Sequence, residues 1–70
     1  MASIKKIIDK IETTAALFKT KPSVVSAKLG QGGRFHARLS EGKQAWPSTL
    51  DAVDSKLDAM LALGTLDLPD

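Results

Sequence analysis

Apolar residues recur at intervals of three and four along most of the chain, which is the spacing of one face of an α-helix. The pattern first covers residues 3–18, where Ser3 stands in a suitable position to cap the first turn. The apolar positions of this segment are Ile4, Ile7, Ile8, Ile11, Ala15 and Phe18. We therefore expect an amphipathic first helix of about four turns.

A short second helix is predicted to begin at Pro22 or Ser23, because proline is tolerated in the first turn of a helix. It ends at Leu29, since Gly30 can adopt the left-handed conformation that terminates a helix. The residues expected to point inward are Val25 and Leu29, with Ser26 and Ala27 small enough to allow a close helix crossing.

A glycine-containing turn, residues 31–33, precedes a predicted third helix over residues 34–41, which Gly42 ends. Phe35 and Leu39 are four residues apart and indicate its buried stripe. The residues on a different face are Arg34, Arg38 and Glu41, and His36 is close to the boundary between the two faces.

Pro47 indicates that a fourth helix follows, and Ser48 or Thr49 is expected to be its capping residue. Asp51 lies in the predicted first turn, where the helix dipole favours a negative charge. Gly64 ends it. Its apolar face consists of Leu50, Val53, Leu57, Met60 and Leu61 and continues to about Leu63.

Four helices in this order predict an all-α fold, a compact bundle containing a helix-turn-helix. A chain of 70 residues has room for one small domain, which we place at residues 1–64. Residues 65–70 form a tail that is frayed or docks against a neighbour, and Leu66 and Leu68 are the reason to consider docking.

Composition excludes several classes of site. The chain has no cysteine and one histidine, so neither a disulfide nor a zinc site is expected, and no cofactor is implied. No nucleophile, base and oxyanion arrangement stands out in a domain too small to enclose a cleft, so we expect no enzyme. His36 is expected as a hydrogen-bonded core or boundary residue.

Two further features have local interpretations. Trp46 beside Pro47 is expected to cover the junction of the third and fourth helices, with a DNA-backbone or dimer contact as the alternative. The glycines at 30, 32 and 33 do not make a phosphate-binding loop, because neither a Gly-Lys-Ser/Thr ending nor a preceding strand accompanies them.

Charge is divided unevenly along the chain. Residues 1–46 carry nine Lys and Arg against three Asp and Glu, whereas residues 47–70 carry one Lys against five Asp. The two parts are therefore about +6 and −4, which indicates that the first faces an anionic partner. The N-terminus has no long apolar run, so a cytoplasmic protein without a membrane span is expected.

Ala27-Lys28-Leu29-Gly30, followed after eleven residues by Gly42-Lys43 and then by Pro47-Ser48, resembles the core of lambda-repressor-like (Cro/XRE-type) helix-turn-helix domains. The resemblance covers roughly residues 22–57. This segment is also similar to short phage and proteobacterial regulators of that type. The sequence departs from the pattern in two places. His36 stands where an aliphatic core residue is usual, and Gly32-Gly33 replaces a Ser or Thr cap and a polar base-reading residue.

The resemblance implies that the third helix enters the DNA major groove. Arg34 and Arg38 would read bases, since a guanidinium pairs bidentately with guanine. Phosphates would be bound by Lys28, by Lys43 and by Ser23 with the amides that start the second helix. The full set assigned to DNA is Ser23, Lys28, Gly33, Arg34, Arg38, Lys43 and Gln44, with Ala45 near it and Lys19 and Lys21 as additional phosphate contacts.

The function predicted on this basis is sequence-specific binding of double-stranded DNA by a homodimer, acting as a repressor or an activator. The alternative is a protein-interaction module of the same fold, such as an adaptor, antirepressor or inhibitor. The surface available for a second copy or another protein is the fourth helix and tail, with Leu57, Leu61, Leu66 and Leu68. RNA is a weaker candidate, since no aromatic platform for stacking bases is evident.

Overall fold

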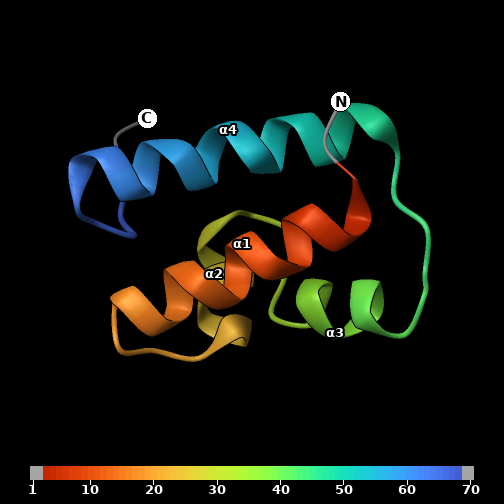
Figure 1. Cartoon of the computed structure of the whole chain (residues 1–70), viewed down its shortest axis with the longest axis horizontal. Helices are drawn as coiled ribbons and strands as arrows, with labels where there is room; N and C mark the ends of the chain where they lie inside the picture. Colours follow the sequence, from red (N-terminus) through yellow and green to blue (C-terminus); the bar gives the residue numbers. More distant parts are fainter. Residues whose placement is uncertain (1–2, 69–70) are drawn as a thin grey trace.

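The structure is a computed structural model that describes residues 3–68. Within that range it consists of helices and loops without strands, so the predicted all-α class is confirmed (Figure 1). The helices are α1 (Ile4–Leu17), α2 (Pro22–Lys28), α3 (Phe35–Ser40) and α4 (Pro47–Leu63). Apart from the start of α4, each boundary lies within two residues of the one that the apolar pattern predicts.

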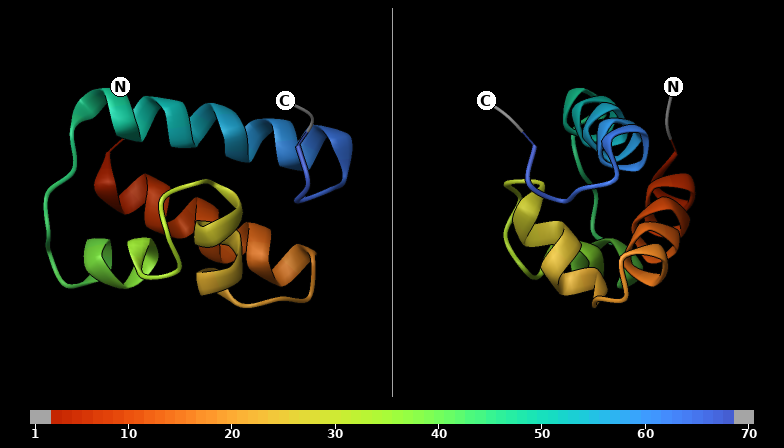
Figure 2. Two further views of the ribbon diagram at one scale, coloured as in Figure 1. Left: turned by 180° about the vertical axis from the view of Figure 1, so that it is seen from behind. Right: turned by 90° about the vertical axis from the view of Figure 1, so that its left-hand side faces the viewer.

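The first helix is the centre of the fold. Helices α2, α3 and α4 all pack against α1, and α2 also packs against α3. In the left view of Figure 2, α4 lies above α1 while α2 and α3 lie below it; in the right view, all three helices lie on one side of α1. Every helix therefore contributes to one core, made of Ile7, Ile11, Ala15, Val25, Leu29, Phe35, Leu39, Leu50, Val53, Leu57 and Met60.

Most helix ends follow the predicted chemistry. The Ser3 hydroxyl accepts a hydrogen bond of 3.1 Å from the backbone N–H of Lys6, so Ser3 is the N-cap of α1. The predicted terminators Gly30, Gly42 and Gly64 all have positive φ, between 69° and 88°. Three of the four helices thus end at glycines whose missing Cβ permits the left-handed conformation.

The start of α4 differs from the prediction. The helix begins at Pro47 and its N-cap is Trp46, so neither Ser48 nor Thr49 caps it, and Asp51 lies beyond the first turn. Proline at the first helical position explains the shift, because its ring fixes a helical φ while the residue before it is held in extended backbone.

The segment after α4 folds back onto the domain. Leu66 and Leu68 are half-buried and pack against the core, and the Asp67 carboxylate lies 2.6 Å from the ammonium of Lys28. Residues 65–68 therefore belong to the domain that we predicted to end at residue 64. The last two residues of the predicted tail, 69 and 70, lie outside the described residues.

No helix within residues 3–68 is long and apolar enough to cross a membrane.

Candidate nucleic-acid interface

Helix α3 is six residues long and has no capping side chain of its own. Its N-cap position holds Arg34, which makes no capping hydrogen bond, and glycines precede it. The cap comes instead from α2: the buried hydroxyl of Ser26 accepts a 3.2 Å hydrogen bond from the backbone N–H of His36. The same hydroxyl donates to the carbonyl of Pro22 at 3.0 Å. Ser26 therefore joins α2 to the start of α3, a role that its sequence context did not reveal.

The side chain of His36 fastens α3 to α1. Its Nε2 atom lies 3.1 Å from a carboxylate oxygen of Glu12, and the His36 side chain is 18% exposed. This confirms the prediction of a hydrogen-bonded boundary residue. Phe35 and Leu39, which are 7% and 3% exposed, form the predicted buried stripe of the same helix. The orientation of α3 is thus determined by contacts on its inner face.

The outer side of α3 presents basic side chains to solvent. Arg34, Arg38 and Lys43 are exposed and line one open hollow of about 530 Å³ together with Gly33. We call this the arginine hollow; Gln31, Gly32, Ala37 and Glu41 complete its lining. None of the three cations forms an ion pair with another residue in the described range 3–68. Their charges are therefore available to an anion outside the chain.

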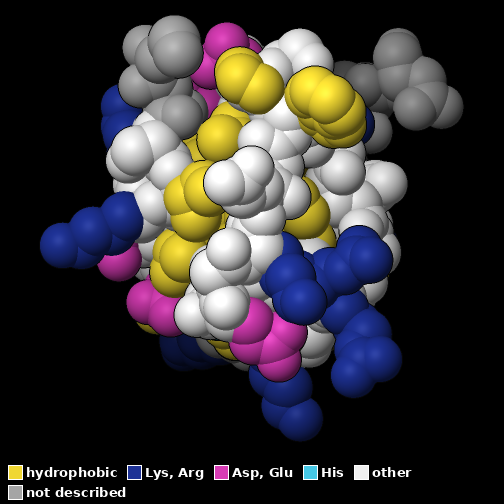
Figure 3. Space-filling view, turned by 90° about the vertical axis from the view of Figure 1, so that its right-hand side faces the viewer, with side chains coloured by type: hydrophobic (Ala, Val, Ile, Leu, Met, Phe, Trp, Pro, Cys, Tyr) yellow, Lys and Arg dark blue, Asp and Glu magenta, His cyan; other side chains and the backbone are white. Residues whose placement is uncertain are grey.

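A second hollow, of about 520 Å³, adjoins the first and shares Arg38 and Lys43 with it. We call it the tryptophan hollow; its lining is Gln31, Phe35, Arg38, Leu39, Lys43, Gln44, Ala45, Trp46 and Thr49. Figure 3 looks onto the side of the molecule where α3, the segment after it and the start of α4 lie. It shows Lys and Arg side chains gathered on part of this face, with a band of hydrophobic side chains beside them.

Trp46 is 79% exposed, so the prediction that it covers the junction of α3 and α4 is wrong. Ala45 and Leu50 pack at that junction, Leu50 being 6% exposed. Because Trp46 precedes a proline at the start of α4, its backbone is extended. Its indole stays at the surface, since Ala45 and Leu50 already pack against the core there. An exposed aromatic side chain therefore lies beside the basic residues, as the alternative interpretation of Trp46 as a contact residue requires.

The remaining predicted site residues divide into two groups. Ser23 is exposed and lies next to the arginine hollow, since a Cβ placed on Gly33 would be 3.7 Å from the Ser23 carbonyl oxygen. Lys28 lines neither hollow, and its ammonium is engaged by Asp67. The structure thus brings Gly33, Arg34, Arg38, Lys43 and Gln44 together, adds Ser23 at the edge, and leaves Lys28 apart.

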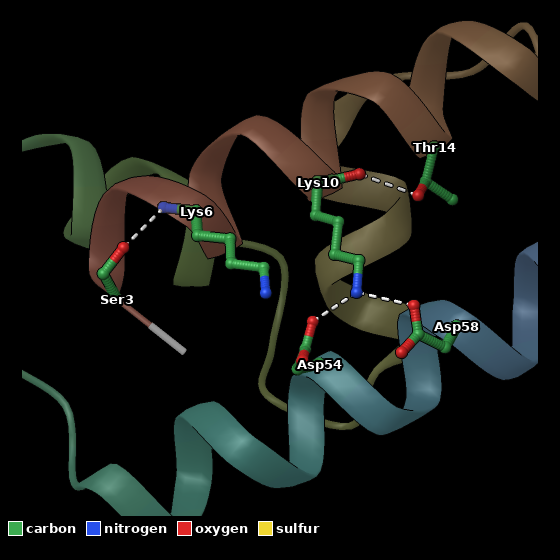
Figure 4. Close-up of polar contacts among 6 residues, drawn as sticks. All are labelled: Ser3, Lys6, Lys10, Thr14, Asp54 and Asp58. Carbon is green, nitrogen blue, oxygen red and sulfur yellow. Dashed lines mark hydrogen bonds and ion pairs between the residues drawn. The ribbon is translucent and has the colours of Figure 1, made fainter. Parts of the chain in front are cut away.

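Two other lysines, Lys10 and Lys56, bind groups of the chain itself. The ammonium of Lys10 on α1 binds Asp54 and Asp58 on α4 (Figure 4). Burial opposes the charged form of Lys10, but hydrogen bonds and charge from both carboxylates outweigh it and raise the pKa of Lys10. The hydrogen bond from Lys10 lowers the pKa of Asp54, against a smaller opposing effect of burial. On α4, Lys56 donates to the carbonyl of Leu29 at 3.2 Å. These cations therefore have structural partners, unlike those of α3.

Within residues 3–68, no group of three or more His, Cys, Asp or Glu side chains is placed to hold a metal ion. Comparison of the chain with known proteins found no matching family model, no matching curated protein and no matching solved structure.

Proposed function

We propose that this protein binds double-stranded DNA in a sequence-specific manner and regulates transcription, with α3 in the major groove. The observation that carries the proposal is the group of three cations, Arg34, Arg38 and Lys43, exposed on one face without an intramolecular ion pair in residues 3–68. The three cations share this face with a single carboxylate, that of Glu41, so the face keeps a net positive charge that opposes folding and favours an external anion. The resemblance of residues 22–57 to lambda-repressor-like domains supports the same interface.

The division of labour follows from side-chain chemistry. Arg34 and Arg38 lie about one turn apart at the start and middle of α3, which suits the edges of neighbouring base pairs. Lys43 follows Gly42 in the loop after the helix and suits a phosphate, because its ammonium is a mobile point charge. A helix of six residues is about 9 Å long and reaches few bases, so we propose a homodimer on two half-sites about 34–36 Å apart.

The test is a selection of genomic fragments with the purified protein, followed by fluorescence anisotropy on the selected duplex at 50 and 200 mM salt. We expect binding to weaken steeply with salt, because phosphate contacts release counterions. Changing both Arg34→Ala and Arg38→Ala should lower affinity at least about tenfold and reduce discrimination between sequences, since a bidentate base contact is worth about 1–3 kcal/mol.

The matched control changes Lys5→Ala and Lys6→Ala, which removes the same charge from exposed positions of α1. It should lower affinity far less than the arginine pair. If no duplex binds at low salt, or if the two double variants behave alike, the proposal is wrong. Light scattering of the free and bound protein measures whether two copies occupy the DNA.

The alternative function is that of a protein-interaction module. The apolar surface that α4 and the tail offer to a protein partner is smaller than the sequence indicated. Leu57 is fully buried, and Leu66 and Leu68 pack against the core, so these three residues are taken up by the fold. The apolar residues left on the end of α4 are Leu61 and Leu63, which are 38% and 60% exposed. A stoichiometric protein partner that stays bound at high salt, together with absence of DNA binding, would favour this function.

A further inference from the structure

The most exposed large hydrophobic side chain in residues 3–68 is Trp46, at 79%. An indole offers a large apolar surface, and its exposure to water is unfavourable unless something covers it. Trp46 lies between Ala45, which packs against the core, and Pro47, the first residue of α4. The backbone on both sides of Trp46 therefore belongs to parts of the chain that contact the core or form α4.

The tryptophan hollow beside this ring combines three kinds of chemistry. Buried Phe35 and Leu39 contribute apolar lining, and Arg38 and Lys43 contribute positive charge. The amides of Gln31 and Gln44 add hydrogen-bond donors and acceptors. A flat apolar ring that carries hydrogen-bonding edges and is attached to a phosphate matches all three, and that description fits a nucleotide.

Bases within an intact duplex are stacked on both faces, so the face of an indole can stack only on a base that has left the helix. We propose that Trp46 and the tryptophan hollow bind an unstacked nucleobase of DNA, whose phosphate is held by Lys43. The inference rests on the proposed DNA-binding function and goes further, because it assigns a preference for DNA that is locally distorted or single-stranded. It also replaces the expectation from the sequence that the chain has no aromatic platform for stacking bases, since Trp46 is exposed. Arg38 and Lys43 line both the tryptophan hollow and the arginine hollow. The unstacked base would therefore lie beside the contacts that α3 makes with the duplex.

Trp46 is the only tryptophan of a chain that has no tyrosine, so intrinsic fluorescence reports on this ring alone. The probes are the duplex selected for the wild-type protein, the same duplex with one unpaired thymine, and a single strand of equal length. We expect the duplex with the unpaired thymine to quench the fluorescence and to bind about tenfold more tightly than the intact duplex, as stacking of one base allows. If only the single strand quenches, then the base comes from single-stranded rather than distorted duplex DNA.

The variant Trp46→Ala should abolish this preference while leaving affinity for the intact duplex within about twofold. Because the indole is largely exposed, the substitution leaves the core intact, and circular dichroism verifies the fold. Trp46→Phe should keep part of the preference, since a smaller ring still stacks. Leu17→Ala is the matched control, because Leu17 is another exposed hydrophobic residue, at 65%, on the distant end of α1. It should keep the full preference.

Two results would overturn the inference without affecting duplex binding. One is tight binding of the unpaired or single-stranded probe without a change in fluorescence. The other is an equal loss of affinity for all three probes in Trp46→Ala, which would make the indole a contact with the DNA backbone. If none of the probes binds, the proposed DNA-binding function fails as well, so the two failures are distinguishable.

Discussion

The buried hydroxyl of Ser26 makes the contact that starts α3. It is fully buried and accepts from the backbone N–H of His36 while donating to the carbonyl of Pro22. Since α3 has only six residues and no cap of its own, this hydrogen bond replaces the Ser or Thr that the glycine-containing turn lacks. A residue ten positions away in the sequence thus satisfies the first turn of the helix that we propose for DNA recognition.

We expect Ser26→Ala to lower the free energy of unfolding by about 1–2 kcal/mol, because it leaves the N–H of His36 without its acceptor. Urea denaturation followed by circular dichroism measures the change. Ser55→Ala, at an exposed position of α4, is the control and should stay within about 0.5 kcal/mol of the wild type. Equal effects of the two substitutions would show that Ser26 does not cap α3.

Among the elements, α1 and α4 are joined by a polar contact as well as by the core. Lys10 binds Asp54 and Asp58, which are four residues apart on α4 and would repel one another without it (Figure 4). The Lys10 side chain is 22% exposed, and the hydroxyl of Thr14 donates to its backbone carbonyl at 2.7 Å. The contact is thus partly shielded from water, and it holds the two longest helices in register.

This contact predicts a pH dependence with a definite sign. The pKa of Asp54 is held below its ordinary 3.8, so its contribution is present above that pH and is lost as pH falls through the lowered pKa. The pKa of Lys10 is raised above 10.5, so its contribution is present below that pH and is lost as pH rises through the raised pKa. We expect Asp54→Asn to lower the free energy of unfolding by about 1 kcal/mol at pH 7.

The measurement is chemical denaturation at a series of pH values. The difference between wild type and Asp54→Asn should shrink as pH falls below 3.8, because the wild-type carboxylate then becomes protonated. Asp9→Asn, at an exposed position on α1, serves as the control. A difference between wild type and Asp54→Asn that stays constant down to acid pH would contradict the assigned role of the ion pair.

At the scale of the whole molecule, the acidic part of the chain neutralises selected cations of the basic part. Asp54 and Asp58 engage Lys10, and Asp67 engages Lys28. The cations left without an ion pair on the α3 face are those that line the arginine hollow. The uneven charge of the sequence thereby leaves a group of cations without ion pairs on the α3 face, which is the face that we propose for DNA.

The position of α1 at the centre makes its core residues decisive for stability. Ile11 is fully buried in the helix that packs against all three others. A domain of 70 residues has a total stability of about 3.5–10 kcal/mol. We expect Ile11→Val to cost about 1 kcal/mol and to lower Tm by about 4–8 °C.

Ile11→Ala should cost about 2–5 kcal/mol, which is a large part of a total stability of about 3.5–10 kcal/mol. Thermal denaturation by circular dichroism measures both variants against Leu17→Ala, which removes an exposed side chain of the same helix. A Tm for Ile11→Ala equal to that of Leu17→Ala would contradict the central role of α1.

The sequence by itself determined the elements. Most core residues could be identified from the sequence, because a helix repeats every 3.6 residues and the apolar residues of its buried face therefore recur every three or four positions. Examples are Ile7, Ile11, Val25 and Leu39. Helix ends at glycine were predictable for the same reason, since the left-handed conformation is a local backbone property. The same spacing placed Arg34 and Arg38 on the outer side of α3.

The tertiary structure alone decided which polar groups meet. Ser26 with His36, Lys28 with Asp67 and Trp46 at the surface all depend on how elements approach one another in space. Contacts of this kind join residues 10 to 48 positions apart, and no local periodicity encodes them. Trp46 was expected to cover the junction of α3 and α4 because it lies beside Pro47, yet Ala45 and Leu50 already pack there, so the indole stays outside.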